Sequence, residues 1–141
     1  MDKIDELTEL TRRFYEAVAR GDTAFLQRLV SRRKEAVFIG SDREDWWEGS
    51  DVFIKAMKAE ADLMMAGGVK ILPGQLQAHR EGNLAWVTDR NPVFRFPNGT
   101  EYPFRHTLLF HLEDGEWKLL HQHSSLARGD GPPITPHGTK P

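Results

Sequence analysis

The feature that most constrains the fold is a pair of alternating apolar segments near the end of the chain, over 102–112 and 116–126. Alternation at a period of two is typical of half-buried β-strands. The turn at 113–116 reads Glu-Asp-Gly-Glu, and Asp-Gly between two such segments is a strong hairpin signal. Two further alternating segments, over 69–80 and 83–96, precede the hairpin. The second half of the chain is therefore predicted to form an antiparallel sheet.

The first half of the chain is patterned for helices. Apolar residues recur at helical spacing over 4–18, which predicts an amphipathic helix of about 17 residues. Asp22 is a suitable N-cap for a short second helix. A third helix is expected from a cap at Ser50 or Asp51 to the two glycines at 67–68. Helices followed by strands predict an α+β fold, in which three helices pack on one face of a curved, mixed or antiparallel sheet.

The remaining segments are short or polar. Residues 36–39 form an apolar run that predicts one more strand, and 40–49 form a polar loop with two adjacent tryptophans. The prolines within the predicted strands indicate edges or bulges. The end of the chain is rich in proline and glycine. We therefore expect one domain over 1–126, followed by a disordered tail over 127–141.

Composition narrows the class of partner. The 141 residues carry a formal net charge of −2 and include no cysteine, so disulfides, thiolate catalysis and cysteine metal sites are excluded. The only dense basic cluster, at 32–34, is expected to complement a helix dipole, so we expect no nucleic-acid partner. No segment approaches the roughly 18 consecutive apolar residues of a membrane span, and the charged start lacks a secretory stretch. A cytoplasmic protein without a membrane partner is expected.

Two histidines, His121 and His123, stand one residue apart in the last predicted strand and suggest a metal at first sight. A structural metal site usually needs four ligands, and the chain offers no cysteine and no nearby carboxylate on that strand. We therefore expect no metal and interpret these histidines as hydrogen-bonded or interface residues. A histidine interface is expected to weaken as the pH falls through about 6.5.

Three local patterns carry a resemblance to a known family. They are Ala-Arg-Gly-Asp at 19–22, Trp-Trp-Glu-Gly at 46–49, and Asp-Gly-x-Trp-x-x-x-His-x-His-x-Ser at 114–125. Over roughly 5–126 the chain resembles the SnoaL-like branch of the nuclear transport factor 2-like superfamily, a cone of curved sheet closed by three helices. The last pattern is also similar to the association domain of calcium/calmodulin-dependent kinases. Members range from ketosteroid isomerases, dehydratases, polyketide cyclases and epoxide hydrolases to non-catalytic assembly modules, so the resemblance implies a fold rather than one function.

The catalytic residues of the ketosteroid isomerases are not matched. Their helix-one tyrosine falls at Phe14, with Tyr15 displaced onto a different helix face. Their proton-shuttling aspartate falls near Gly40, and the nearest carboxylate is Asp42. Proton abstraction beside a carbonyl needs an oxyanion donor and a buried base. The resemblance therefore implies that this protein is not a steroid isomerase.

The register of the last hairpin decides which residues face a cavity. A two-residue turn would group His106 with the two histidines of the last strand. A three-residue loop, with Gly115 in the left-handed conformation of a bulge, would place Leu108 and Ser124 on one face instead. These two positions match the pocket arginines of the kinase-type domain, which favours the second register. We predict the bulge at Gly115.

On this register the cavity is predicted to be mainly apolar with a few polar groups, as small-molecule pockets usually are. Trp46 and Trp47 are interpreted as a lid or as core aromatics, and Arg90 as an anion ligand or as a partner of Asp42 or Asp89. The resemblance implies that Trp86 and Thr88 face inward, and alternation along the strand adds Arg90. Together, the residues expected to line the cavity are Phe14, Trp46, Trp47, Phe53, Met57, Trp86, Thr88, Arg90, Leu108, Phe110, Leu120, Gln122 and Ser124. The resemblance implies a homodimer contact on the opposite face, where Trp117, Leu119, His121 and His123 are expected.

Two functions follow from this predicted site. In the first, His106 is the general acid or base, with Asp42 at the cavity mouth, in the isomerisation, dehydration or cyclisation of a small apolar or amphipathic molecule. Such an isomerase or lyase needs no bound cofactor. In the second, His106 is a buried imidazole that only satisfies its hydrogen bonds. The protein is then a homodimeric ligand-binding or accessory module without chemistry.

Overall fold

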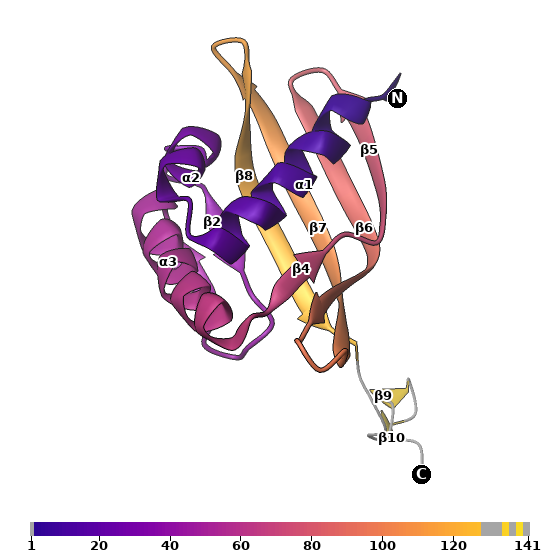
Figure 1. Cartoon of the computed structure of the whole chain (residues 1–141). Helices are drawn as coiled ribbons and strands as arrows, with labels where there is room; N and C mark the ends of the chain where they lie inside the picture. The colour runs from indigo at the N-terminus through magenta and orange to yellow at the C-terminus, as the bar shows by residue number, and fades with distance from the viewer. Residues whose placement is uncertain (1, 128–133, 136–137, 140–141) are drawn as a thin grey trace.

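The fold is a curved sheet with three helices packed against one side of it (Figure 1). The computed structural model describes residues 2–127, 134–135 and 138–139. The helices are α1 (Asp5–Arg20), α2 (Thr23–Leu29) and α3 (Ser50–Gly67). The strands are β1 (Asp2–Lys3), β2 (Val37–Ile39), β3 (Trp46–Glu48), β4 (Lys70–Leu72), β5 (Gln75–Glu81), β6 (Leu84–Arg95), β7 (Glu101–Glu113), β8 (Glu116–Leu126), β9 (Ile134–Thr135) and β10 (Gly138–Thr139). The predicted α+β class is confirmed.

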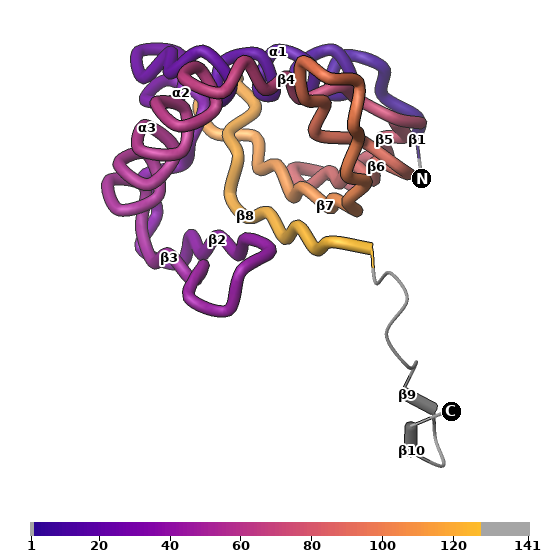
Figure 2. The backbone as a smooth tube through the Cα atoms, turned by 60° about the horizontal axis from the view of Figure 1, so that its bottom comes forward, coloured from indigo at the N-terminus to yellow at the C-terminus, as the bar shows by residue number. Residues whose placement is uncertain are grey.

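The large sheet has the strand order β1-β5-β6-β7-β8-β2-β3, and β4 pairs with β6. The long strands β5 to β8 pair antiparallel, whereas β2 runs parallel to β8. Figure 2 shows the strands curving beneath α1, with α2 and α3 at the flank near β2 and β8. Trp46–Glu48, expected as loop, is a strand because its backbone pairs with β2 at the sheet edge. The predicted strand over 69–80 is divided around Pro73 into β4 and β5.

The helix ends follow local chemistry. The helix α1 ends at Gly21, whose φ of 69° is the left-handed conformation that glycine adopts without strain. Asp22 caps α2 as predicted, since its carboxylate accepts a hydrogen bond from the amide of Phe25 at 3.1 Å. The predicted cap of α3 at Ser50 or Asp51 is wrong. The chain turns out of β3 at Gly49, with φ 92°, so the helix already begins at Ser50.

The last hairpin combines both registers that the sequence left open. Its turn has two residues, because Glu113 pairs with Glu116 and both Asp114 and Gly115 have positive φ, as a type I′ turn requires. The predicted bulge at Gly115 is therefore wrong. The extra residue is Leu120 instead, since the register shifts where Phe110 pairs with Leu119 and Leu109 with His121.

The bulge at Leu120 gives the residues beyond it the same inward orientation that the predicted bulge at Gly115 would have given. Beyond it, His106 pairs with Ser124 and Leu108 with Gln122, and all four side chains are on the helix side of the sheet. The prediction for Leu120 itself is wrong. Leu119 takes the inward position and is fully buried, while Leu120 is half-buried.

The inner face of β6 also differs from the prediction. Ala85, Val87 and Asp89 are buried, and alternation along the strand places Trp86, Thr88 and Arg90 on the outer face. Their predicted inward orientation is wrong, because the odd-numbered residues of this part of β6 face the core and the even-numbered residues face away from it. Asn91, with φ 63°, and Pro92 form a bulge between Arg90 and Val93, as expected for a proline inside a strand.

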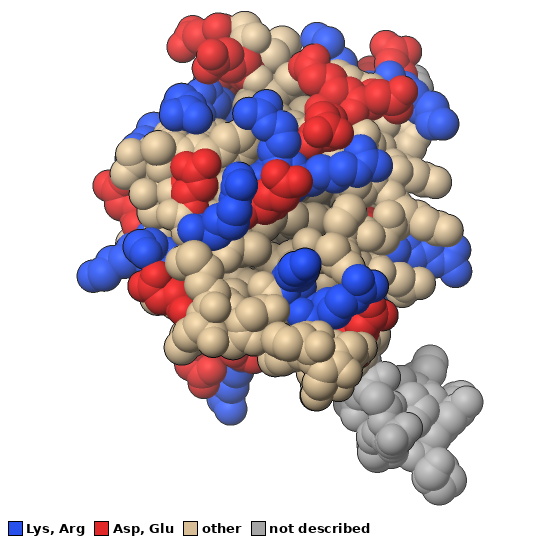
Figure 3. Space-filling view, viewed as in Figure 1, with Lys and Arg blue, Asp and Glu red and all other residues tan. Residues whose placement is uncertain are grey.

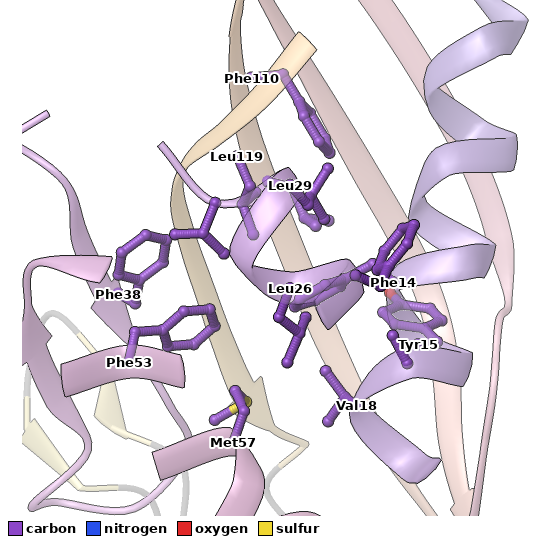
Figure 4. Close-up of a cluster of buried hydrophobic side chains, with 14 of the residues drawn as sticks. Phe14, Tyr15, Val18, Leu26, Leu29, Phe38, Phe53, Met57, Phe110 and Leu119 are labelled. Carbon is purple, nitrogen blue, oxygen red and sulfur yellow. The ribbon is translucent and has the colours of Figure 1, made fainter. Parts of the chain in front are cut away.

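The core lies between the helices and the inner face of the sheet (Figure 4). Phe38 of β2 and Phe53 of α3 stack within it, with ring centroids 4.1 Å apart and planes 10° apart. Phe14 of α1 also stacks on Phe53, with ring centroids 6.5 Å apart. Leu26 of α2 and Leu119 of β8 are fully buried around these rings. The aromatic stack therefore ties two helices and the end of the sheet together.

Charges of both signs are interspersed on the face shown in Figure 3, so this face presents no single-sign patch. Within the described residues, no helix has the length and apolar character needed to span a membrane. Most of the predicted tail over 127–141 lies outside the described residues. Within it, β9 and β10 pair with each other.

Candidate functional site

A cavity of about 80 Å³ lies between α1, α3 and the strands β7 and β8. One water molecule needs roughly 10–15 Å³ by the same kind of measure, so the cavity has room for several waters or a small organic group. Its walls are mainly apolar, with Phe14, Met57, Met64 and Phe94 among them. Polar groups enter from the sheet side, from α3 and from the loop between β2 and β3, which contributes Ser41 and Asp45.

The polar groups on the sheet side form a buried chain of hydrogen bonds. The hydroxyl oxygen Oη of Tyr15 lies 2.8 Å from Oδ2 of Asp89 and 3.0 Å from Nδ1 of His106. Nε2 of His106 contacts Oε1 of Gln122, whose amide nitrogen donates to the carbonyl of Ile39 at 3.0 Å. Both ring nitrogens of His106 are therefore engaged within the protein. Tyr15, His106 and Gln122 line the cavity, and Asp89 lies behind them.

Burial determines which of these hydrogen-bonded side chains are protonated. It raises the pKa of Asp89, against the hydrogen bonds from Tyr15 and Gly74 and the charge of Arg12. It lowers the pKa of His106 to about 4, so that this imidazole is neutral at pH 7. Burial raises the pKa of Tyr15 well above its ordinary value. The predicted role of His106 as a proton-transfer group is not favoured by an imidazole with both nitrogens engaged and a depressed pKa.

A close backbone approach fixes Asp89 from the far side. The amide of Gly74 donates to Oδ1 of Asp89 at 3.0 Å, and a Cβ at this glycine would lie 2.0 Å from the carbonyl oxygen of Arg90. We expect Gly74→Ala to lower the free energy of unfolding by about 1–3 kcal/mol, because β5 and β6 must move apart. Urea unfolding measures this loss. Gly67→Ala is the control, because its nearest neighbour lies at 3.4 Å; equal midpoints for both variants would contradict the expected clash.

The polar group on the helix side is the carboxyl of Glu60. It projects from α3 into the cavity lining, and its pKa is raised to about 7 by burial and by the nearby charges of Asp45 and Asp42. Among the described residues, no basic side chain forms a salt bridge with Glu60. A carboxyl that titrates near pH 7 can both accept and release a proton under physiological conditions.

A wider groove of about 430 Å³ lies outside the cavity. Glu60, Asp45, Ser41, Met64 and Phe94 line both spaces, so the groove and the cavity meet at Glu60. The groove is otherwise mainly apolar. Its further lining includes Leu63, Val69, Phe96, Tyr102 and Leu126.

Several predicted site residues do line the cavity. Phe14, Trp47, Met57, Gln122 and Ser124 are among them, together with His106. Of the two tryptophans, Trp47 faces inward and packs against Phe53 at 5.8 Å, while Trp46 is 59% exposed and bonds Glu48. The structure thus separates the pair that the sequence treated together.

Other predicted lining residues lie elsewhere. Phe53, Leu108 and Phe110 are core residues outside the cavity lining. Trp86, Thr88 and Arg90 face away from the cavity, so Arg90 does not pair with the inward Asp89. Asp42 is exposed and lines the outer groove, not the cavity.

The predicted dimer residues are divided between two faces. His121 and His123 lie on the outer face, where Nδ1 of His121 donates to the carbonyl of Val37 at 2.6 Å. Leu119 is fully buried in the core and Trp117 packs against it, so their predicted place at an outer contact is wrong. The bulge at Leu120 adds one residue to β8, so side chains at odd-numbered positions point inward before the bulge and outward after it.

Among the described residues, no group of three potential metal-ligating side chains is brought together.

Sequence reasoning missed Tyr15, Asp89 and Glu60. Tyr15 lies four residues after the buried Thr11, which places it on the buried side of α1. Asp89 continues the inward alternation of the small apolar residues Ala85 and Val87. Glu60 lies three residues after the buried Met57. These spacings were the available signals.

The comparison with protein families gives one match. A family model described as the SnoaL-like domain matches residues 7–129. No functionally curated protein matches the chain.

Solved structures with the same fold include three bacterial proteins. A nuclear transport factor 2-like protein of unknown function from Pseudomonas putida superposes with a TM-score of 0.76 at 18% identity, over 89% of this chain and 87% of the other. An uncharacterised protein with a cystatin-like fold from Caulobacter vibrioides gives 0.72 at 16% identity, over 89% and 90%. A protein from Streptomyces avermitilis, provisionally named a dehydratase of the same superfamily, gives 0.71 at 17% identity, over 89% and 96%. These similarities establish the fold.

Proposed function

Because this chain belongs to the SnoaL-like domain family, we propose that its cavity takes up a small, mainly apolar molecule and rearranges it by general acid–base chemistry, with Glu60 as the proton-transfer group. The observation that carries this proposal is the carboxyl of Glu60 in the lining of a mainly apolar cavity, without a salt bridge among the described residues; burial there raises its pKa to about 7. General acid–base catalysis is most effective when the pKa of the catalytic group is near the working pH. Glu60 therefore replaces His106 and Asp42 as the favoured catalytic residue.

The reaction class follows from what a single carboxyl can do. Ionised Glu60 removes a proton from carbon and becomes a neutral acid, and the electron pair of the broken bond moves into the substrate. In an isomerisation the acid then returns the same proton at a second carbon. In a dehydration the proton leaves with the departing hydroxyl as water. Both reactions balance without an oxidant or reductant, so neither requires a redox cofactor.

The shape of the site favours an amphipathic substrate with its reactive end innermost. The cavity has room only for a small group, whereas the groove that meets it at Glu60 is larger and mainly apolar. The acidic side chains Asp42 and Asp45 beside Glu60 disfavour a substrate that is anionic at this point. Neutral lipophilic ketones, alcohols and lactones are therefore better candidates than fatty acids.

A thermal-shift screen of such neutral molecules, followed by mass spectrometry of each stabilising compound, tests the proposal. We expect a compound that raises the melting temperature and is converted to an isomer or dehydration product on incubation. Compounds that stabilise the protein and are recovered unchanged across the screen would contradict the catalytic part.

The second candidate is a binding module without chemistry. The engaged nitrogens and depressed pKa of His106 favour it, because they leave no free imidazole in the cavity wall. In the same screen it predicts a stoichiometric ligand that is bound and returned intact.

We further propose that two copies associate through the outer face of the sheet. There Trp86 pairs with Leu109 and Leu109 with His121, so an apolar and imidazole row crosses three strands. Light scattering is expected to give twice the chain mass, and Leu109→Glu is expected to return the mass to that of one chain. A wild-type monomer at high concentration would contradict this association.

A further inference from the structure

Four buried side chains form a hydrogen-bonded series whose protons can be counted from its geometry. In order they are Asp89, Tyr15, His106 and Gln122. Every contact of hydrogen-bond length needs one hydrogen between its two atoms, because two facing lone pairs repel each other. Buried polar networks of this kind are stable only when each member is satisfied.

The orientation of the Gln122 amide is fixed by the backbone of Ile39. The carbonyl oxygen of Ile39 can only accept, so the Gln122 amide nitrogen donates to it at 3.0 Å. The amide oxygen of Gln122 then faces His106 and can only accept. Nε2 of His106 therefore carries a hydrogen.

Tyr15 has one hydroxyl hydrogen for two contacts, at 3.0 Å to His106 and 2.8 Å to Asp89. If His106 is neutral, its Nδ1 is a bare acceptor and takes the tyrosine hydrogen, so Asp89 must carry a proton of its own. If Asp89 is ionised, it takes the tyrosine hydrogen, and Nδ1 must be protonated. An ionised Asp89 together with a neutral His106 leaves two lone pairs facing each other.

We infer that Asp89, Tyr15 and His106 hold one proton in common, and that this proton rests on Asp89. Asp89 is then a neutral carboxylic acid that donates to Tyr15, and Tyr15 donates to neutral His106. Asp89 is 3% exposed and His106 5% exposed, and such burial favours this neutral arrangement over a separated ion pair. Asp89 acts through its neighbours and is a positioning residue.

Charged and polar groups of the neighbouring elements act on both Asp89 and His106. Arg12 of α1 favours a carboxylate at Asp89, while His123 of β8 disfavours an imidazolium at His106. The Gly74 amide fits either form, because a protonated acid keeps a carbonyl oxygen for it. Burial is the largest influence on both pKa values, raising that of Asp89 and lowering that of His106, in agreement with the neutral arrangement.

The consequence is a proton relay behind the cavity wall. When the hydrogen of Asp89 moves to Tyr15 and the hydrogen of Tyr15 moves to Nδ1 of His106, the cavity wall gains an imidazolium and Asp89 becomes a carboxylate. No proton is taken from solvent. The positive charge of the imidazolium would stabilise the negative charge that develops on a substrate when Glu60 removes a proton. This use rests on the proposed function, whereas the resting protonation does not.

Infrared and nuclear magnetic resonance spectroscopy of the ligand-free protein test the resting state. At pH 7 we expect the carbonyl stretch of a protonated carboxylic acid that disappears in Asp89→Asn, and ¹⁵N shifts of a neutral His106 protonated at Nε2. Tyr15→Phe identifies the same band by its shift if Asp89→Asn does not fold. The inference is overturned by the absence of this band, or by a His106 protonated at both nitrogens. Neither measurement depends on a substrate, so failure here is distinct from failure of the proposed catalysis.

The pH dependence of unfolding gives an independent test. Above pH 6.5 the folded protein keeps the shared proton, which the separated Asp and His of the unfolded chain have lost. The folded-to-unfolded ratio of the wild type should therefore fall tenfold per pH unit between pH 7 and 8, relative to Asp89→Asn. The amide is the matched control, because its NH₂ donates to Tyr15 and its oxygen accepts from Gly74 as the neutral acid does. Parallel pH profiles for the two proteins would overturn the inference.

Discussion

Replacement of Glu60 by glutamine is expected to lower the turnover of a substrate of this protein by about 10²–10⁴-fold, the usual contribution of a positioned general acid or base. The amide keeps the size and polarity of the side chain but does not exchange a proton at neutral pH. Wild-type turnover is expected to change with pH through about 7, where Glu60 titrates. In Glu60→Gln this inflection is expected to disappear together with the rate. Steady-state kinetics between pH 5 and 9, with the converted compound from the screen, measure both effects.

The matched control for this prediction is Asp62→Asn, two residues further along α3. Asp62 is exposed and pairs with Lys58 at 2.6 Å on the surface of the helix. Its replacement removes one negative charge, as Glu60→Gln does, but leaves the cavity unchanged. Turnover in Asp62→Asn should therefore equal that of the wild type. Equal turnover in Glu60→Gln and wild type would remove Glu60 from the mechanism.

The second large effect is expected in the aromatic stack of the core. Phe53→Ala should lower the free energy of unfolding by about 3–5 kcal/mol, because it removes a fully buried ring and leaves a cavity. The loss includes the stacking with Phe38 at 4.1 Å and with Phe14 at 6.5 Å. Urea unfolding monitored by circular dichroism measures the change.

Val52→Ala provides the comparison for Phe53→Ala on the same turn of α3. Val52 is 52% exposed, so its truncation should change the free energy of unfolding by less than about 0.5 kcal/mol. If the two variants unfold at the same urea concentration, the buried aromatic stack does not make the expected contribution to stability.

The fold was largely predictable from local patterns. The periodicity of the apolar residues indicated the three helices and the long strands, and Asp22 as a cap and Pro92 at a bulge followed from their own chemistry. The position of the last bulge was not predictable in this way. Leu120 lies in a run of apolar residues, and nothing in its side chain distinguishes it as the extra residue. The predicted bulge at Gly115 gave the correct face for the wrong reason.

The site was predictable only in part, because it depends on the parity of strands and the rotation of helices. Gln122 and Ser124 line the cavity, as the chosen face predicted, while their role in binding stays a prediction. Asp89 was missed because a one-residue shift in β6 exchanges its face with that of Arg90. Glu60 was missed for a different reason. Its raised pKa arises from burial and from the charges of a loop about 15 positions away in sequence.

The central claim, that the cavity carries a proton-transfer group active near neutral pH, is tested most directly by the pKa of Glu60. The ¹³C shift of its side-chain carboxyl can be followed through a pH titration and identified by its absence in Glu60→Gln. We predict a midpoint at about 7. A midpoint near the ordinary value of 4.5 would show a solvated surface carboxylate and would contradict the account.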